Sequence, residues 1–390
     1  MDWPGLQAAW QGGAWVALAG PGEQAPPFPD AARLPEGPGV VVGSGGTTGG
    51  RRWCLQPYAH LEASARATAA WLEAQDLDPA RCLHLNPLPL HHVSGLLPRV
   101  RAAQWGSGHL AIAPAVMRDP AALAAAVPIP AGRPAVLSLV PTQLRRLMAE
   151  PPGVEWLCQL AVIWVGGAAL PPELAASARH HGLRLAPCYG ATETAAMVAA
   201  LAPGAFLAGG EGCGQPLSDV ELRLDSATAA VEVRCGRLSP GWLQGDRVVP
   251  LATTADGWWR SGDAGRQTST GLRILGRLDG AISSGGETVF PEQLEVRLMA
   301  AAQNAGLPLE ALLLLPEADP EWGQRLVALV RPRSGPSVES LIQGLRGCVA
   351  SWPPAERPRR WVGCPSLTPT ATGKWRRSHW QAWLRSLEAG

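Results

Sequence analysis

Short apolar runs alternate with helix-like segments through the first half of this chain. Runs of strand length occur at residues 82–85, 136–139, 161–165 and 183–186. Segments whose apolar residues recur at helical spacing separate them, as at 142–149 and 171–180. Such alternation is typical of parallel strands joined by covering helices. We therefore predict an α/β fold with helix-covered, mostly parallel sheets.

The pattern changes at both ends of this region. Residues 1–37 are rich in Gly, Pro and Trp without a firm period, which predicts a loop with short helical pieces. Between residues 220 and 260, short alternating runs broken by glycines predict a small antiparallel sheet or barrel. The remaining residues mix helical and strand patterns, which predicts a smaller α+β domain. A chain of 390 residues has room for two or more such units.

Charge and hydropathy exclude several classes of partner. The 33 basic residues nearly balance the 32 acidic residues, and neither sign forms a run, so we expect no nucleic acid or membrane surface as partner. No apolar run approaches the roughly 18 residues that cross a bilayer. The first residues lack the basic and apolar segments of a secretory signal. We expect a cytoplasmic protein that binds small molecules, and the sequence leaves a homo-oligomer open.

A segment rich in glycine and hydroxyl groups follows the apolar run at 39–42. It reads Gly43-Ser44-Gly45-Gly46-Thr47-Thr48-Gly49-Gly50-Arg51-Arg52. The N–H groups of consecutive glycines can converge on phosphate oxygens, and the hydroxyls add donors. No Lys-Ser/Thr pair follows, so the segment is not the common NTPase loop, and a surface turn is the alternative.

A second segment, Tyr189-Gly190-Ala191-Thr192-Glu193, follows the apolar run at 183–186. Ligands of open α/β sheets bind where strands end. Tyrosine can stack on a base, threonine can donate to a phosphate, and glutamate can hold a hard cation such as Mg²⁺. The alternative is a strand-to-helix turn with an ordinary threonine cap.

Several further segments are weak when taken singly. They are His91-His92-Val93-Ser94-Gly95, Ser261-Gly262-Asp263, Gly276-Arg277-Leu278-Asp279, Ser284-Gly285-Gly286-Glu287 and Gly373-Lys374. The two adjacent histidines lack the spacing of a zinc site, and loop or core histidines are the alternative. Lys374 is the single lysine of the sequence, although a lysine at such a position is usually solvated.

Taken in order, these segments resemble the adenylate-forming superfamily of acyl-CoA synthetases, luciferases and peptide-synthetase adenylation domains. The resemblance covers about residues 43–374. It implies a large N-terminal domain, residues 1–278, and a smaller mobile domain, residues 279–390, that rotates about a hinge at Asp279 and carries the catalytic lysine. It also implies ATP, Mg²⁺ and coenzyme A as ligands, and a reaction that passes through an acyl-adenylate.

The resemblance assigns roles to single residues. It implies that the ATP phosphates are held by Ser44, Gly45, Gly46, Thr47, Thr48, Gly49 and Arg52. It implies that the nucleoside is held by Tyr189, Gly190, Asp263 and Arg277. The catalytic residues that it implies are His92, Thr192, Glu193 and Lys374, with Glu193 holding Mg²⁺ and Lys374 bridging the acid and the phosphate. Gly285 and Gly286 are implied to face the pantetheine arm of coenzyme A.

The segment from Pro89 to Gly95, with Arg101 beyond it, is most similar to that of the o-succinylbenzoate:CoA ligases of menaquinone and phylloquinone synthesis. This likeness implies that the acid contacts Ser94, Arg101, Gly166 and Gly167, and that the guanidinium neutralises a second carboxylate. Other aryl- and acyl-CoA ligases share His-x-x-Gly, so another carboxylic acid is the first alternative. A nucleotide-binding relative without catalysis is the second. The chain departs from the usual pattern at Arg51-Arg52, where the family has Pro-Lys, and at Gly280, where it has Asp.

Overall fold

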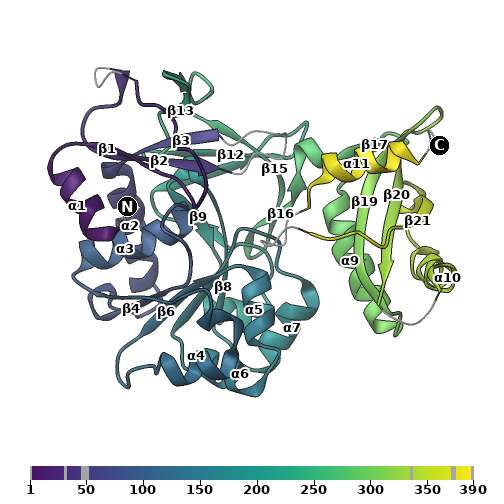
Figure 1. The fold of residues 1–390 in the computed structure, drawn as a ribbon, viewed down its shortest axis with the longest axis horizontal. Helices are drawn as coiled ribbons and strands as arrows, with labels where there is room; N and C mark the ends of the chain where they lie inside the picture. The colour runs from purple at the N-terminus through teal and green to yellow at the C-terminus, as the bar shows by residue number, and fades with distance from the viewer. Residues whose placement is uncertain (1, 30–32, 45–51, 334–336, 370–374, 388–390) are drawn as a thin grey trace. The chain divides into compact units, whose positions relative to one another are not determined.

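The computed structural model describes residues 2–29, 33–44, 52–333, 337–369 and 375–387. The chain divides into two compact units (Figure 1). The N-terminal unit comprises Met1–Ser261 and Arg266–Ile274, and the C-terminal unit comprises Gly262–Gly265 and Leu275–Gly390. The second unit therefore begins its main segment shortly before Asp279, and a hinge at that residue stays a prediction.

A seven-stranded sheet forms the centre of the N-terminal unit, in the order β10-β9-β8-β7-β6-β4-β5. Its strands are β4 (Leu83–Asn86), β5 (Gly108–Ala111), β6 (Ala135–Leu139), β7 (Val162–Val165), β8 (Leu185–Ala191), β9 (Ala196–Ala200) and β10 (Gln215–Pro216). The pairs from β5 to β8 are parallel, whereas β9 and β10 run antiparallel to their neighbours. The predicted parallel strands are confirmed.

Helices cover this sheet because its strands are apolar on both faces. Figure 1 shows helices beside β6 and β8, namely α4 (Pro120–Ala126), α5 (Pro141–Leu147), α6 (Pro151–Cys158) and α7 (Pro172–His180). Their leucines share one core cluster with Ile163 and Val165 of β7. Val162 and Trp164 alternate with those residues and join a second cluster with Leu72. This alternation is what a strand buried on both faces requires.

A second sheet of the same unit has the order β1-β2-β3-β13-β14. Its strands are β1 (Trp15–Leu18), β2 (Gly39–Ser44), β3 (Arg52–Pro57), β13 (Gly241–Gln244) and β14 (Arg247–Pro250). Helices α1 (Trp3–Gln11), α2 (Tyr58–Glu73) and α3 (Val93–Trp105) contribute to the core beneath it. The prediction of loop for residues 1–37 is wrong at β1, because that strand forms by parallel pairing with distant β2.

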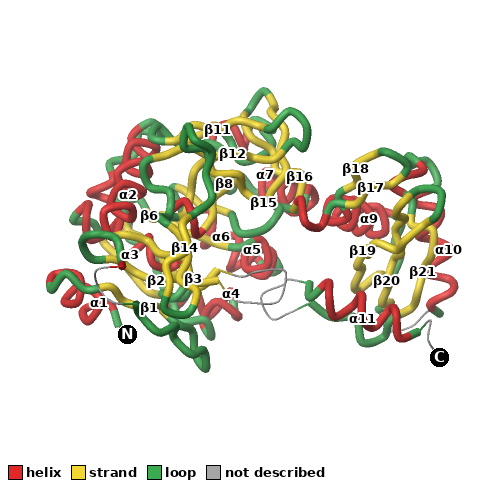
Figure 2. The backbone as a smooth tube through the Cα atoms, turned by 90° about the horizontal axis from the view of Figure 1, so that it is seen from above, coloured by secondary structure: helices red, strands yellow, loops and turns green. Residues whose placement is uncertain are grey.

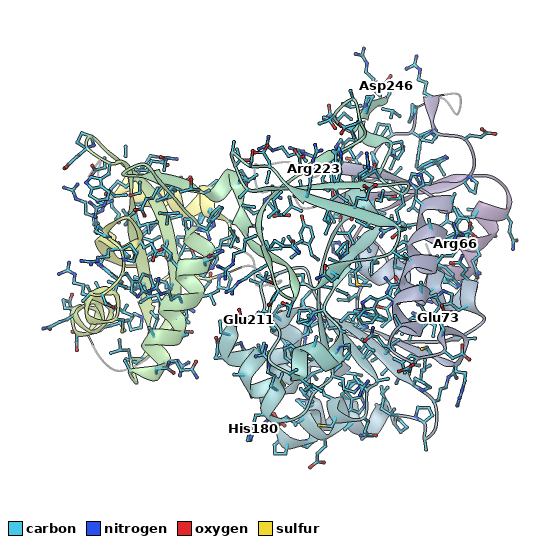
Figure 3. The ribbon with its side chains drawn as sticks, turned by 180° about the vertical axis from the view of Figure 1, so that it is seen from behind. Arg66, Glu73, His180, Glu211, Arg223 and Asp246 are labelled. Atoms are coloured by element: carbon cyan, nitrogen blue, oxygen red, sulfur yellow. The ribbon has the colours of Figure 1, made fainter. Side chains whose placement is uncertain are left out.

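A third sheet confirms the predicted antiparallel region. It has the order β11-β12-β15-β16, with strands β11 (Val220–Leu224), β12 (Ala230–Cys235), β15 (Trp259–Thr268) and β16 (Gly271–Arg277). Leu222 pairs with Val233 in the antiparallel register of β11 and β12. Arg223, which Figure 3 labels on β11, places its guanidinium carbon 4.2 Å from the ring centroid of Trp258. The short helix α8 (Pro203–Leu207) lies between β9 and β10 in sequence.

The C-terminal unit mixes helices and strands, as predicted (Figure 2). Its sheet consists of β17 (Ile282–Ser284), β18 (Glu287–Val289), β19 (Leu309–Asp319), β20 (Gly323–Pro332) and β21 (Pro358–Gly363), and its helices are α9 (Pro291–Asn304), α10 (Val338–Val349) and α11 (Arg377–Ser386). One core cluster includes Leu298 of α9 and Leu345 of α10, and another includes Trp380 of α11. Within the described parts of the chain, no helix is long and apolar enough to cross a membrane.

Candidate active site

The parallel strand β8 ends in the predicted Tyr-Gly-x-Thr-Glu segment. Thr192–Thr194 form a single 3₁₀ turn, which leads back into the antiparallel strand β9. Gly190 lies so close to this returning strand that a Cβ would approach the Ala196 carbonyl oxygen to 2.1 Å. Only glycine fits there. Thr192 and Glu193 are half-buried at the end of the sheet, where α/β proteins bind their ligands.

Tyr189 is held in place from the third sheet. Its hydroxyl donates to Ser261 Oγ at 3.1 Å, and Ser261 is buried. The bond fixes the tilt of the phenol ring, and the ring offers a flat surface on which a base can stack. Two of the predicted segments therefore meet within the N-terminal unit.

The predicted ribose residues and the predicted hinge residue lie together in the C-terminal unit. Arg277 Nη1 is 3.7 Å from an Asp263 carboxylate oxygen, whereas its Nε and Nη2 lie 3.2 and 3.1 Å from the two oxygens of Asp279. A Cβ at Gly262 would approach Arg277 Nη2 to 2.6 Å, so this glycine admits the guanidinium. The structure thus places one guanidinium between two carboxylates.

The predicted phosphate loop falls mostly outside the described residues. Ser44 ends β2 and Arg52 begins β3, and the two are register partners in the antiparallel pair. The guanidinium carbon of Arg52 is 5.6 Å from the ring centroid of Trp242. Gly45, Gly46, Thr47, Thr48 and Gly49 lie outside the described residues, as does Lys374.

Helix α3 carries the residues predicted to meet the acid. His92 is its N-terminal capping residue, in extended conformation, and its ring centroid is 4.5 Å from that of His91. Ser94, in the first turn, is exposed, whereas Arg101 is 4% exposed. The two are seven residues apart, which is close to two helical turns, so they share one face of α3.

Arg101 is a buried cation without a carboxylate partner in the part of the chain that the structure describes. Its guanidinium carbon lies 5.3 Å from the ring centroid of Trp164, and its Nε has no hydrogen-bond partner among the described residues. Among the described residues, no carboxylate forms an ion pair with the Arg101 guanidinium. Burial lowers the pKa of Arg101 to about 10. Because an unpaired buried charge is costly, the site favours an anionic ligand.

Gly166 and Gly167 follow β7 directly, beside the end of β8. A Cβ on Gly166 would lie 2.9 Å from the sulfur of Cys188, and Gly167 has a φ of +78°. Cys188 is a near neighbour of Arg101 and partly offsets the lowering of the Arg101 pKa by burial. The carboxyl ends of β7 and β8 therefore bring together Trp164, Gly166, Cys188 and Arg101.

Gly285 and Gly286 form the turn between β17 and β18. Both have positive φ, +59° and +85°. A Cβ on Gly285 would approach the ring of Trp322 to 2.6 Å, while none of the described residues has an atom within 4 Å of a Cβ on Gly286. The glycine turn predicted here is present, and its contact with coenzyme A stays a prediction.

The donor set at the turn after β8 fits a magnesium ion that is shared with phosphates. Among the described residues, no three His, Cys, Asp or Glu side chains gather as a metal site. Mg²⁺ in nucleotide sites usually needs only one or two carboxylates beside phosphate and water oxygens. The half-buried carboxylate of Glu193 meets that requirement.

Sequence reasoning missed three residues that shape this region. Trp164 and Cys188 line the surroundings of Arg101, and Arg237 donates to the carbonyl oxygen of Thr194. Trp164 could have been found from its place just before Gly166 at a strand end. Arg237 leaves no local signal, because its partner is 43 residues away.

Comparisons with a family model and with curated sequences find relatives of this chain. The model of the AMP-binding enzyme family matches residues 11–237. The chain is 32% identical over 247 residues to a 2-succinylbenzoate–CoA ligase of Salmonella typhimurium, a match of 63% of this chain and 50% of that protein. It is 28% identical over 367 residues to an indoleacetate–CoA ligase of Aromatoleum aromaticum, or 88% of this chain and 66% of that protein.

Solved structures give the same result. The E. coli MenE with a bound phenylether-linked analogue of OSB-AMS superposes with a TM-score of 0.63 at 27% identity, over 90% of this chain and 69% of that chain. The present chain spans half to about two thirds of the length of these relatives. The family match covers more than half of the chain, so the chain belongs to the AMP-binding enzyme family.

Proposed function

We propose that this chain is an ATP-dependent acid–thiol ligase that activates o-succinylbenzoate and transfers it to coenzyme A. The observation that carries the choice of acid is the buried guanidinium of Arg101, which has no carboxylate partner among the described residues. The acid has two carboxylates. One is activated, and the other would form two parallel hydrogen bonds with Arg101. Pairing would remove the cost of the lone buried charge.

The reaction has two steps. First, a carboxylate oxygen of the acid attacks the α-phosphorus of ATP and pyrophosphate leaves, which gives a mixed anhydride with AMP. The thiolate of coenzyme A then attacks the acyl carbon, AMP leaves, and a thioester remains. The first step changes the leaving group on the acyl carbon. An oxide ion would leave poorly from the free acid, whereas AMP leaves readily from the mixed anhydride.

The turn after β8 would serve the first step. The hydroxyl of Thr192 would donate to the α-phosphate, and Lys374 would bridge that phosphate and the acid. Mg²⁺ held by Glu193 would neutralise phosphate charge. Donors placed where charge develops contribute roughly 2.7–4 kcal/mol each to lowering the barrier.

Other residues would bind rather than react. Tyr189, with Gly190 beside it, would support the adenine, and the carboxylate of Asp263 would accept from the ribose with Arg277 nearby. The segment 44–49 and Arg52 would hold the outer phosphates.

Three further assignments belong to the proposal. His92 and Ser94, at the start of α3, and Gly166 and Gly167, after β7, would line the path of the acid. Gly285 and Gly286 would face coenzyme A after residues 279–390 turn about Asp279. The cytoplasm is the compartment that supplies ATP and coenzyme A together.

A panel of acids tests the proposal through pyrophosphate release. The informative pair is o-succinylbenzoate and 4-phenyl-4-oxobutanoate, which has the same skeleton without the second carboxylate. We expect kcat/KM to fall roughly 100-fold for the second acid, because a buried charge is then left unpaired. Equal use of both acids would contradict a diacid site.

A monocarboxylic aryl acid is the second candidate. The likeness to an indoleacetate–CoA ligase over 88% of this chain favours it. Indoleacetate therefore belongs in the panel, and its preferred use would establish this alternative. Binding of ATP without pyrophosphate release for any acid would indicate a relative that has lost catalysis.

A further inference from the structure

Four consecutive carbonyl oxygens of the Thr192–Ala195 turn accept hydrogen bonds from outside the turn. The donors are Gln56 Nε2 to Thr192 O (2.5 Å), Ser239 N to Glu193 O (2.7 Å), Arg237 Nη1 to Thr194 O, and Ser64 Oγ to Ala195 O (2.6 Å). They come from β3, from α2 and from the segment between β12 and β13. Each of these four donor residues is buried. The backbone of the turn is therefore fixed from several sides.

Arg237 extends this network beyond the turn. Its side chain is fully buried, and besides Thr194 O it donates from Nη2 to Met197 O at 2.8 Å. Nε donates to Asp219 Oδ2 at 2.6 Å, which balances the charge. One planar guanidinium thus bridges the carbonyls on either side of Ala195 and Ala196. Its rigid fork suits such a bridge, and a lysine ammonium cannot reproduce that geometry.

The bridged residues have an unfavourable backbone. Ala195 and Ala196 have φ of +49° and +76°, in the left-handed region that residues with a Cβ avoid. Such a conformation persists only where its surroundings fix it, and it occurs often at functional sites. Arg237 supplies part of that restraint, because its two bonds span the pair, and Ser64 Oγ adds a bond to Ala195 O.

We propose that Arg237 is a positioning residue that sets the geometry of Thr192 and Glu193 toward MgATP. This inference rests on the proposed function, in which those two residues contact the α-phosphate and Mg²⁺. Arg237 contacts neither ligand and acts through the turn. Groups that orient metal-binding residues in this way usually change metal affinity or activity about 10–100-fold when they are mutated.

The test is Arg237→Lys, which keeps the charge for Asp219 but loses the bridge between Thr194 O and Met197 O. The matched control is Arg179→Lys. Arg179 also donates to two backbone carbonyls of the same unit, Phe206 O at 2.8 Å and Gly210 O at 2.9 Å, and does not contact the turn. Both variants should lose thermal stability, so the readout must go beyond stability.

That readout is the Mg²⁺ dependence of ATP binding, measured by calorimetry on the full chain without any acid. Arg237→Lys should raise the Mg²⁺ concentration for half-maximal ATP binding about 10–100-fold. It should also slow pyrophosphate release by a similar factor and leave thioester formation from supplied acyl-adenylate unchanged. Arg179→Lys should keep the wild-type Mg²⁺ dependence. Equal Mg²⁺ dependence in the wild type and Arg237→Lys overturns the inference and leaves the proposed function intact.

A second variant separates positioning from folding. Glycine adopts positive φ without strain, so adding Ala196→Gly to Arg237→Lys should restore much of the lost melting temperature. If Arg237 positions the turn, Mg²⁺ affinity stays weak in the double variant. Recovery of Mg²⁺ affinity together with stability would show that Arg237 serves folding alone, and would overturn the inference.

The two proposals also fail differently. A wild type that binds MgATP but releases no pyrophosphate with any acid refutes the ligase function, while the Mg²⁺ comparison still decides the role of Arg237. A wild type that does not bind MgATP refutes both.

Discussion

The hydroxyl of Tyr189 donates to Ser261 Oγ at 3.1 Å, although 72 residues separate the two. Tyr189 lies in β8 and Ser261 lies in β15, so the bond links the central sheet to the third sheet. The bond restrains the ring that we propose supports the adenine. Under the proposed function, Ser261 would thereby support nucleotide binding through Tyr189.

Loss of that bond should weaken ATP binding without blocking catalysis. Ser261→Ala removes the acceptor and leaves the ring in place, so we expect the KM for ATP to rise by a factor that corresponds to about 0.5–1.5 kcal/mol. The maximal rate should change little. Steady-state kinetics with varied ATP measures both, and a large fall in kcat at unchanged KM would contradict a supporting role for Tyr189.

Arg101→Met should stabilise the protein while it destroys the preference for a diacid. Methionine fills a similar volume and removes a buried cation that has no carboxylate partner among the described residues, so unfolding should cost about 1–4 kcal/mol more. Denaturant unfolding without ligands tests this. The ratio of kcat/KM for o-succinylbenzoate over 4-phenyl-4-oxobutanoate should approach one. Arg99→Met is the control, because Arg99 lies on the same helix over Trp3. It should keep the preference.

Gly166→Ala should disturb the packing at the end of β7. The new Cβ would lie 2.9 Å from the sulfur of Cys188, and such overpacking costs about 1–3 kcal/mol. Cys188→Ala removes the sulfur, so the double variant should recover most of the loss. A double-mutant cycle on unfolding free energy measures the coupling. Additive effects of the two substitutions would show that Cys188 is not the obstacle.

Lys374 should be needed for the first step alone. Lys374→Ala should slow adenylation at least roughly 100-fold, by analogy with the loss of a single preorganised donor. Thioester formation from supplied acyl-adenylate should continue. Since Lys374 is the only lysine, an amine-selective reagent can reach no other side-chain ammonium, and ATP should protect against it. Equal loss of both steps in Lys374→Ala would contradict the division of labour.

The N-terminal unit should lose stability in acid through His109. Burial, with a further effect from the charge of Arg99, lowers the pKa of His109 from 6.5 to about 4. Asn86 Nδ2, which can only donate, lies 3.2 Å from the ring Nε2, so the neutral ring accepts there. His109 therefore takes up a proton near pH 6.5 in the unfolded chain, but only near pH 4 in the folded chain.

The contribution of His109 to the free energy of unfolding is fully present above about pH 6.5 and declines as the pH falls toward 4. The slope is at most about 1.4 kcal/mol per pH unit, and partial exposure of the ring reduces it. Chemical denaturation at a series of pH values measures it. His109→Gln should flatten the curve in this window, and an unchanged slope would assign the effect to other groups.

The sequence predicted the parts of the fold that depend on local pattern. The apolar runs that became β6, β7 and β8 are long enough and apolar enough to identify without a structure. The sequence did not predict helix α3, because Gly95 and Pro98 interrupt its pattern. Strand β1 needs its distant partner β2 to be recognised at all.

The candidate site shows the same division. The apolar run at 183–186 predicted that Thr192 and Glu193 would lie where a strand ends, and they follow β8 directly. The cation of Arg101 was singled out, but its burial against Trp164 follows from packing between a helix and a sheet. The bonds of Arg237 join residues 40 and 43 positions apart, and no pattern in one sequence encodes them.

The rise of α3 sets a length scale for whatever enters beside it. A helix advances 1.5 Å per residue, so the exposed hydroxyl-bearing residue at position 94 and the buried cation at position 101 start about 10 Å apart along the axis. A molecule that spans this interval must carry its negative charge at the matching depth. The helix would then select acids by their length. Moving the guanidinium by one turn would change the length of the accepted acid by about 5 Å.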